Sequence, residues 1–169
     1  FGVGFKSKVV AYDPHLSSKQ FSNLGVTSLP LEELLSSSDI ISLHCPLTEA
    51  TKRILDRERI SKMKPGAILI NTCRGELLDQ TALIERLTSK QLRVYATDVV
   101  EGEPIDNNHP LLSLNNVIVL PHLGGYTEQS LFGMGETMVN DCENVFVNKT
   151  TPNTLANPNV LSSERKRWA

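Results

Sequence analysis

Short apolar runs alternate with longer amphipathic segments along the chain. The runs predict five strands, at residues 8–12, 39–44, 67–71, 92–97 and 116–120. Most of them stop at a proline or an acidic residue, as at Asp13-Pro14 and Pro46. Near-continuous apolar runs of this length are typical of strands that are covered on both faces in a parallel sheet.

Between the strands, apolar residues recur at the three- and four-residue spacing of helices. We expect helices at residues 31–35, 56–63, 79–88 and 127–147. Pro30 suits the first position of the first helix, and Asp79 suits the N-cap of the third. The alternation predicts an α/β fold with a doubly wound parallel sheet, in which ligands bind beyond the carboxyl ends of the strands.

The composition indicates a folded protein rather than a disordered one. Of the 169 residues, 40% are hydrophobic and 21% are charged. The 17 Lys and Arg against 19 Asp and Glu give a net charge of −2, which gives no reason to expect nucleic-acid binding. We interpret the basic cluster at residues 165–167 as a solvated chain end. No stretch approaches the roughly 20 apolar residues that span a bilayer, and the N-terminus is not that of a signal peptide.

The three cysteines, Cys45, Cys73 and Cys142, are far apart in the sequence. Their spacing fits neither a disulfide framework nor a zinc site, so we predict no bound metal and a reducing, cytoplasmic location. Cys73 could in principle be a nucleophile beside Arg74, but no histidine is adjacent to it, and we disfavour that role.

Groups that bind anions or transfer protons follow four of the five predicted strands: Asp13, Arg74, Asp98 and His122, with Glu103 shortly after Asp98. His122 is the best acid-base candidate, because a histidine exchanges protons near neutral pH. Pro121 before it and Gly124-Gly125 after it would hold the ring while a ligand approaches the backbone. The remaining histidines lack such a setting, and we expect them to be structural or exposed: His15, His44 and His109.

The other groups each have a structural and a functional interpretation. Arg74 could hold a carboxylate by two parallel hydrogen bonds, or it could form a surface ion pair. Glu103 could pair with His122, or it could be a solvated loop carboxylate. Asp13 could bind the two hydroxyls of a ribose, or it could shape the turn before Pro14.

Together these segments resemble the D-isomer-specific 2-hydroxyacid dehydrogenases from about residue 8 to residue 148. The resemblance rests on several motifs that keep the order and spacing of that family. They are residues 12–14, 44–48, 63–75, 98–104, 110–112, 116–117 and 121–125. The family implies a Rossmann-type fold and an NAD-dependent oxidoreductase that reduces 2-keto acids to D-2-hydroxy acids.

The resemblance also implies roles for individual residues. Arg74 would bind the substrate carboxylate, His122 would exchange the proton of the 2-hydroxyl, and Glu103 would raise the proton affinity of His122. Asp98 matches the acidic residue near the nicotinamide, and Asp13 matches the one that binds the adenosine ribose and favours NAD over NADP. The cofactor-binding positions implied are Asp13, Pro14, Cys45, Pro46, Thr72, Cys73, Arg74, Asp98, His122, Gly124 and Gly125.

The chain departs from the family at its N-terminus. The family has a glycine-rich phosphate-binding turn ahead of the strand that ends at Asp13. Gly2-Val3-Gly4 does not supply that turn, since Ser7 stands in place of the third glycine and no strand comes before it. We therefore expect residues 1–150 to be a partial NAD-binding domain, incomplete at the N-terminus, that lacks its first strand and glycine-rich loop. Residues 151–169 would return to a substrate domain, and the isolated chain would be inactive and bind NAD weakly or not at all.

Two alternatives and several details stay open. One alternative is a non-enzymatic NAD(H)-sensing binding protein, like the corepressors that share this fold and its catalytic residues. The other is a formate dehydrogenase of the same superfamily, which the acidic Glu103 disfavours because those enzymes pair the histidine with glutamine. Hydroxypyruvate, glyoxylate, phosphohydroxypyruvate and larger 2-keto acids are all possible substrates. The family further implies a homodimer.

Overall fold

The protein is described by a computed structural model, which covers residue 4, residues 6–157 and residue 159. It divides into two units, Phe1–His122 and Leu123–Ala169. The predictions for residues 1–3 and for the basic cluster at residues 165–167 lie outside the described residues.

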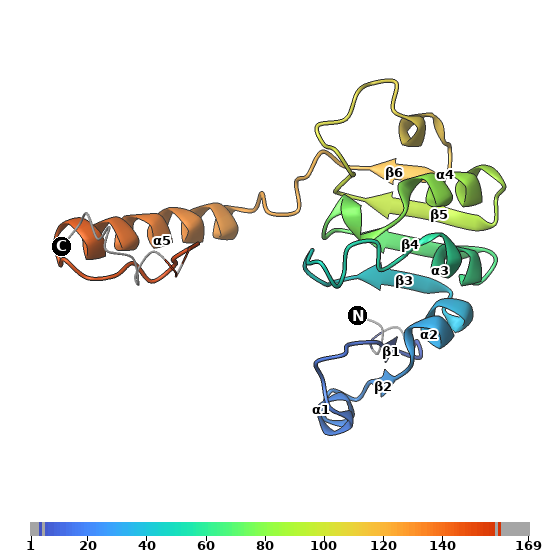
Figure 1. The fold of residues 1–169 in the computed structure, drawn as a ribbon, viewed down its shortest axis with the longest axis horizontal. Coiled ribbons are helices and arrows are strands. Elements are labelled where there is room, and N and C mark those ends of the chain that lie inside the picture. The colour runs from blue at the N-terminus through green and yellow to red at the C-terminus, as the bar shows by residue number, and fades with distance from the viewer. Residues whose placement is uncertain (1–3, 5, 158, 160–169) are drawn as a thin grey trace. The chain divides into compact units, whose positions relative to one another are not determined.

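The described part of the first unit contains six strands, and within each sheet the paired strands are parallel (Figure 1). They are β1 (Val10–Ala11), β2 (Thr27–Ser28), β3 (Ile40–Leu43), β4 (Ala67–Asn71), β5 (Leu92–Thr97) and β6 (Val117–Val119). Two sheets result: β1 pairs with β2, and the other four lie in the order β3-β4-β5-β6. The five predicted strands are present, although those at either end of the unit are shorter than predicted. β2 was not predicted, because two residues are too few to show a periodicity.

Helices connect successive strands. They are α1 (Ser18–Asn23), α2 (Leu31–Ser37), α3 (Arg57–Lys62) and α4 (Gln80–Thr88), with short 3₁₀ helices η1 (Gly75–Leu77) and η2 (Pro110–Ser113). The prediction for Pro30 is wrong by one residue. Its extended ψ of 148° places it before α2, so Leu31 is the first helical residue. α1 was missed, although Ser17 and Gln20 form a capping box that marks its start.

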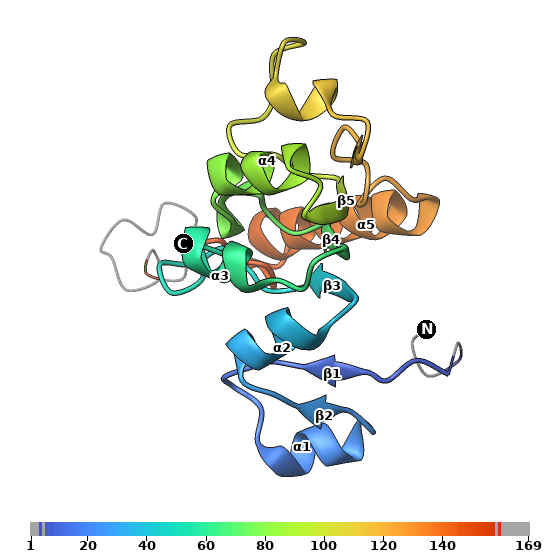
Figure 2. The ribbon, with the colours of Figure 1, turned by 90° about the vertical axis from the view of Figure 1, so that its right-hand side faces the viewer.

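The main core lies between the four-stranded sheet and α2, α3 and α4 (Figures 1 and 2). Alternate strand residues point into it, since successive side chains of a strand face opposite sides. Ile41, Leu69 and Tyr95 occupy one row of partners across three strands and are all buried. Leu83 and Leu87 of α4 pack into the same core and are buried.

The opposite face of this sheet is only partly covered among the described residues. Ile40 in β3 is 61% exposed, and Ile118 in β6 is 56% exposed. α2, α3 and α4 all contribute to the core on the other face. Within the first unit, helices therefore cover one face of this sheet, and the predicted coverage of the second face stays a prediction.

The second unit contains the longest helix, α5 (Glu128–Phe146), which begins at the N-cap Thr127 close to the predicted boundary. Its apolar residues have helical spacing, but none of the described helix residues is buried. The chain that follows turns back, and Asp141 accepts hydrogen bonds from the backbone N–H groups of Asn153 and Thr154. No helix in the described part of the chain is both long and apolar enough to cross a membrane.

The N-cap of α4, Asp79, allows a test of how this helix is stabilised against the core of the first unit. Its carboxylate accepts a hydrogen bond from the backbone N–H of Ala82 at 2.9 Å and so caps α4. Replacing it by alanine should lower the free energy of unfolding by about 0.5–2 kcal/mol, measured by urea denaturation. Asp79→Asn should keep most of the stability, because an asparagine side chain also accepts that bond. Equal losses in both variants would contradict the capping role.

Candidate active site

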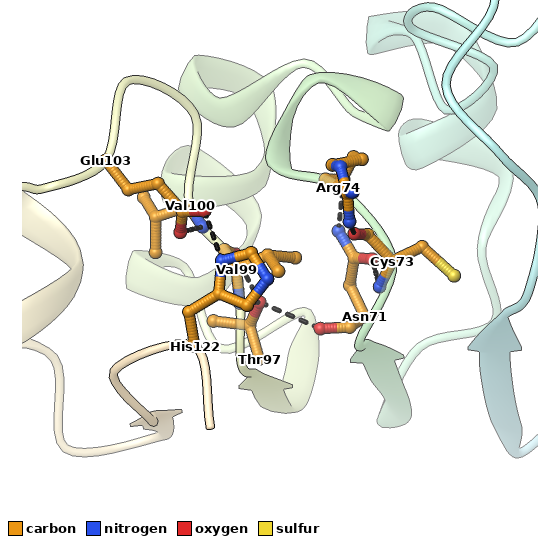
Figure 3. A network of polar contacts seen from close by, with 8 residues as sticks. All are labelled: Asn71, Cys73, Arg74, Thr97, Val99, Val100, Glu103 and His122. Carbon is orange, nitrogen blue, oxygen red and sulfur yellow. Dashed lines mark hydrogen bonds and ion pairs between the residues drawn. The ribbon is translucent and has the colours of Figure 1, made fainter. Parts of the chain in front are cut away.

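The carboxyl ends of β3, β4, β5 and β6 lie at one edge of the sheet, since all four strands are parallel. The loops that leave this edge contain most of the predicted site residues of the first unit. Arg74 follows β4, Asp98 and Glu103 follow β5, and His122 follows β6. Figure 3 shows these loops gathered above the strand ends.

Glu103 and His122 form a direct pair, which is one of the two arrangements that the sequence left open for Glu103. The His122 Nδ1 atom lies 2.5 Å from the Glu103 Oε1 atom (Figure 3). An ionised carboxylate only accepts hydrogen bonds, so Nδ1 carries the hydrogen between them. The other ring nitrogen, Nε2, is then the atom that can give or take a proton. Both side chains are partly exposed, at 49% for His122 and 36% for Glu103.

The backbone fixes both members of this pair. The second carboxylate oxygen of Glu103 accepts a hydrogen bond of 3.1 Å from the backbone N–H of Val100. His122 has a φ of 56°, in the left-handed region that is uncommon for residues other than glycine. Such backbone angles persist where the surrounding structure holds them, and they occur often at functional sites.

Arg74 is exposed and lies between β4 and η1. Its Nη1 atom donates a hydrogen bond of 2.6 Å to the carbonyl of Cys73. No ion pair of Arg74 is present among the described residues. The surface ion pair that the sequence left open is therefore not formed there, and a guanidinium in this place can bind an anion.

Four predicted cofactor positions near Arg74 follow β3 and β4. Thr72 and Pro46 are exposed, whereas Cys45 and Cys73 are half-buried. The thiol of Cys73 donates a hydrogen bond of 3.1 Å to the carbonyl of Leu43, the last residue of β3. Asp98 is only 4% exposed, and its backbone N–H donates to the carbonyl of Asn71 at 3.2 Å.

The remaining predicted positions lie away from these loops or in the second unit. Asp13 and Pro14 follow β1 in the two-stranded sheet, and the Asp13 carboxylate accepts a hydrogen bond of 2.8 Å from the backbone N–H of His15. This bond is the turn-forming interaction that the sequence allowed. Gly124 and Gly125 belong to the second unit, where they form a turn ahead of α5.

The other histidines have structural or exposed positions, as predicted. His15 and His44 are exposed, and the His44 ring lies 2.9 Å from the Ser42 hydroxyl. His109 is half-buried, contacts Gln80 at 3.1 Å and caps η2. No cluster of three or more potential metal ligands occurs in the described part of the chain.

Sequence reasoning assigned no role to two buried polar residues, Asn71 and Thr97. They end β4 and β5, are 0% and 3% exposed, and are partners in adjacent strands. The alternation of residues along β4 could have identified Asn71 as a buried polar residue. Ala67, Leu69 and Asn71 share one face of β4, so a polar residue falls on the core side immediately before a loop.

Burial controls the reactivity of the two thiols near Arg74. It raises the pKa of Cys73, and together with the neighbouring Cys73 thiol it raises the pKa of Cys45. Only a thiolate reacts with iodoacetamide, so both should react slowly at neutral pH and accelerate as pH rises. Exposed Cys142 serves as the internal reference for labelling followed by peptide mass spectrometry. Labelling of Cys73 as fast as Cys142 at neutral pH would contradict this account.

Comparison with known proteins places these motifs in a family. The sequence profile of the D-isomer specific 2-hydroxyacid dehydrogenase NAD-binding domain matches residues 2–124. The chain belongs to this family. The NAD-binding domain identifies NAD as the cofactor, and the parallel sheet with its helices is of the Rossmann type.

Individual members of the dehydrogenase family cover most of the chain. D-3-phosphoglycerate dehydrogenase of Methanocaldococcus jannaschii is 37% identical over 157 residues, which are 92% of this chain and 30% of that protein. Hydroxypyruvate reductase of Thermotoga maritima is 41% identical over 139 residues, covering 81% of this chain and 44% of that protein. The crystal structure of D-lactate dehydrogenase from Aquifex aeolicus complexed with NAD and lactic acid is 35% identical. It has a TM-score of 0.74 and covers 82% of this chain and 46% of that one. The chain thus spans less than half the length of these relatives.

Proposed function

We propose that the chain is the catalytic part of an NAD-dependent oxidoreductase that reduces 2-keto acids to D-2-hydroxy acids. The observation that carries the proposal is the Glu103–His122 pair at 2.5 Å, at the same sheet edge as Arg74, which forms no ion pair with the described residues. An acid-base histidine and a carboxylate-binding arginine are the two groups that this reaction needs from the protein.

Each side chain has a separate task in this proposal. Arg74 holds the substrate carboxylate and supplies positive charge where the carbonyl oxygen becomes an alkoxide. Protonated His122 donates the Nε2 proton to that oxygen and ends the reaction neutral. Glu103 orients the ring through Nδ1 and stabilises its positive charge. NADH, when bound, would supply the hydride for C2 of the keto acid.

The cofactor-binding residues are proposed from both sheets. Asp13 would bind the adenosine ribose with its carboxylate, next to Pro14. Asp98 would lie near the nicotinamide. The remaining contacts would come from the loops at the carboxyl edge and from the turn before α5: Cys45, Pro46, Thr72, Cys73, Arg74, His122, Gly124 and Gly125. The half-buried carboxylate of Asp13 at a strand end suits a ribose, whose two hydroxyls donate hydrogen bonds.

The break in the sheet supports the proposal that residues 1–150 are a partial NAD-binding domain. A doubly wound dinucleotide-binding sheet has the strand order 3-2-1-4-5-6. Read from β2, the chain gives β2-β1 and then β3-β4-β5-β6, so one strand placed between β1 and β3 gives that order, with β6 as a seventh strand at its end. In both views of the ribbon, β1 lies on the β3 side of β2 (Figures 1 and 2). Residues 151–169 would return to a substrate domain, in a longer protein that we call the parent protein.

Titration with NADH, followed by nucleotide fluorescence, tests this proposal on two proteins. The 169-residue chain should show weak or no saturable binding, because its sequence contains no glycine-rich turn for the pyrophosphate. The parent protein should bind NADH saturably, and it should form a homodimer as the family implies. Saturable micromolar binding to the 169-residue chain would contradict the proposed need for a further segment.

A further inference from the structure

The two loops that carry Arg74 and Glu103 are joined below the site by buried polar groups. Asn71 and Thr97 occupy the last shared row of β4 and β5, with Leu43 and Val119 as their outer partners. Burying a polar side chain is costly unless it is hydrogen-bonded. The hydrogen bonds of Asn71 and Thr97 therefore indicate which parts of the structure these buried side chains hold in place.

The side chain of Asn71 holds the Arg74 loop. Its Nδ2 atom donates a hydrogen bond of 2.8 Å to the carbonyl of Arg74. Its Oδ1 atom accepts a hydrogen bond of 3.0 Å from the backbone N–H of Cys73. One amide thus fixes the backbone on both sides of the peptide bond that leads into Arg74 (Figure 3).

The hydroxyl of Thr97 holds the start of the other loop. It accepts a hydrogen bond of 3.1 Å from the backbone N–H of Val99. It also lies 2.9 Å from the carbonyl of Asn71 and 2.5 Å from that of Val99, and its single hydrogen serves one of them at a time.

Gly75 brings the two loops into direct contact. A Cβ atom added to it would lie 2.0 Å from the backbone nitrogen of Glu101 and 2.3 Å from the carbonyl carbon of Val100. Ordinary contacts of a Cβ atom lie at 3.4–4 Å, so any side chain here would force the backbones apart by more than 1 Å. Val100 in turn donates the hydrogen bond that orients Glu103, and Glu103 binds His122.

We propose that Asn71, Gly75 and Thr97 form a clamp that sets the position of Arg74 relative to the Glu103–His122 pair. All three are positioning residues, because each has a hydrogen bond or close contact that reaches the backbone of one of the two loops. The inference rests on the proposed function for the roles of Arg74 and His122. A displacement of about 1 Å in such a site can cost about 10²-fold in rate.

Kinetics of the parent protein test the clamp, with hydroxypyruvate and NADH as the probes. Gly75→Ala should lower kcat by about 10²-fold while the KM for NADH changes little, because the displaced groups orient the substrate. Gly135→Ala is the matched control, since no described atom lies within 4 Å of its added Cβ. Thr97→Val should also lower kcat, and Thr97→Ser should restore most of it by returning the hydroxyl. If Gly75→Ala does not fold, the comparison of Thr97→Val with Thr97→Ser decides the test.

A second readout needs no turnover. The hydrogen between His122 Nδ1 and Glu103 should give a downfield proton NMR signal in the 169-residue chain, because the acceptor is a charged carboxylate. Gly75→Ala and Thr97→Val should move or remove this signal, whereas Thr97→Ser and Gly135→Ala should keep it. Signal changes in an inactive parent protein would support the clamp and refute the proposed function. An unchanged signal and unchanged kcat in Gly75→Ala, or equal effects of Thr97→Val and Thr97→Ser, would overturn the clamp.

Discussion

Replacing His122 by asparagine is expected to lower the kcat of the parent protein by about 10²- to 10⁴-fold, the usual contribution of a positioned acid-base group. Asparagine can still accept or donate hydrogen bonds near Glu103, but it cannot release a proton to the carbonyl oxygen. NADH oxidation with a 2-keto acid gives the rate, and NADH fluorescence shows that the cofactor still binds.

His15→Asn provides the matched control for this variant. His15 is exposed, and its contact with the Asp13 carboxylate comes from its backbone N–H, which asparagine keeps. Its kcat should stay at the level of the unchanged protein. An undiminished kcat in His122→Asn would show that another group transfers the proton, and the assignment of His122 would then be wrong.

Replacing Arg74 by alanine is expected to lower kcat/KM for a 2-keto acid by about 10²–10³-fold, comparable to the loss of one charge-stabilising donor. The effect should appear in both constants, since the guanidinium binds the carboxylate and also stabilises the developing alkoxide. Arg74→Lys should recover only part of the loss, because an ammonium cannot form two parallel bonds to a carboxylate.

Arg93→Ala controls for the loss of a positive charge. Arg93 is an exposed residue within β5 and is not among the residues proposed for the site. Its removal should leave kcat/KM unchanged. If Arg74→Lys were fully active, simple charge rather than two-point binding would account for substrate recognition.

The strands could be predicted from the sequence because their apolar runs are uninterrupted and end at polar or proline residues. β4 and β5 match their predicted bounds, 67–71 and 92–97. α1 was missed because Phe21 is its one apolar residue and so gives no repeated spacing, and β2 was missed because it has only two residues. Coverage of both faces was expected from the apolar character of β3 and β6. Which face a helix covers depends on tertiary packing, which hydropathy alone does not encode.

The site was predictable only in part. Arg74, Glu103 and His122 could be chosen because each bears a reactive group at a loop after a strand. Asn71, Gly75 and Thr97 act through hydrogen bonds and backbone contacts between segments about 26 residues apart. Such contacts depend on the register of β4 against β5, which places Asn71 beside Thr97. A sequence shows that these residues are polar or small, but not what they touch.

Hydride transfer itself gives the most direct test of the central claim. The parent protein would be incubated with NADH deuterated at C4 and, in turn, with glyoxylate, hydroxypyruvate, phosphohydroxypyruvate and larger 2-keto acids. The products would be examined by NMR. The proposed function predicts deuterium at C2 of a 2-hydroxy acid of D configuration (where C2 is a stereocentre), with none formed by His122→Asn. Saturable NADH binding without deuterium in any product would contradict the enzymatic assignment and favour an NAD(H)-sensing binding protein instead.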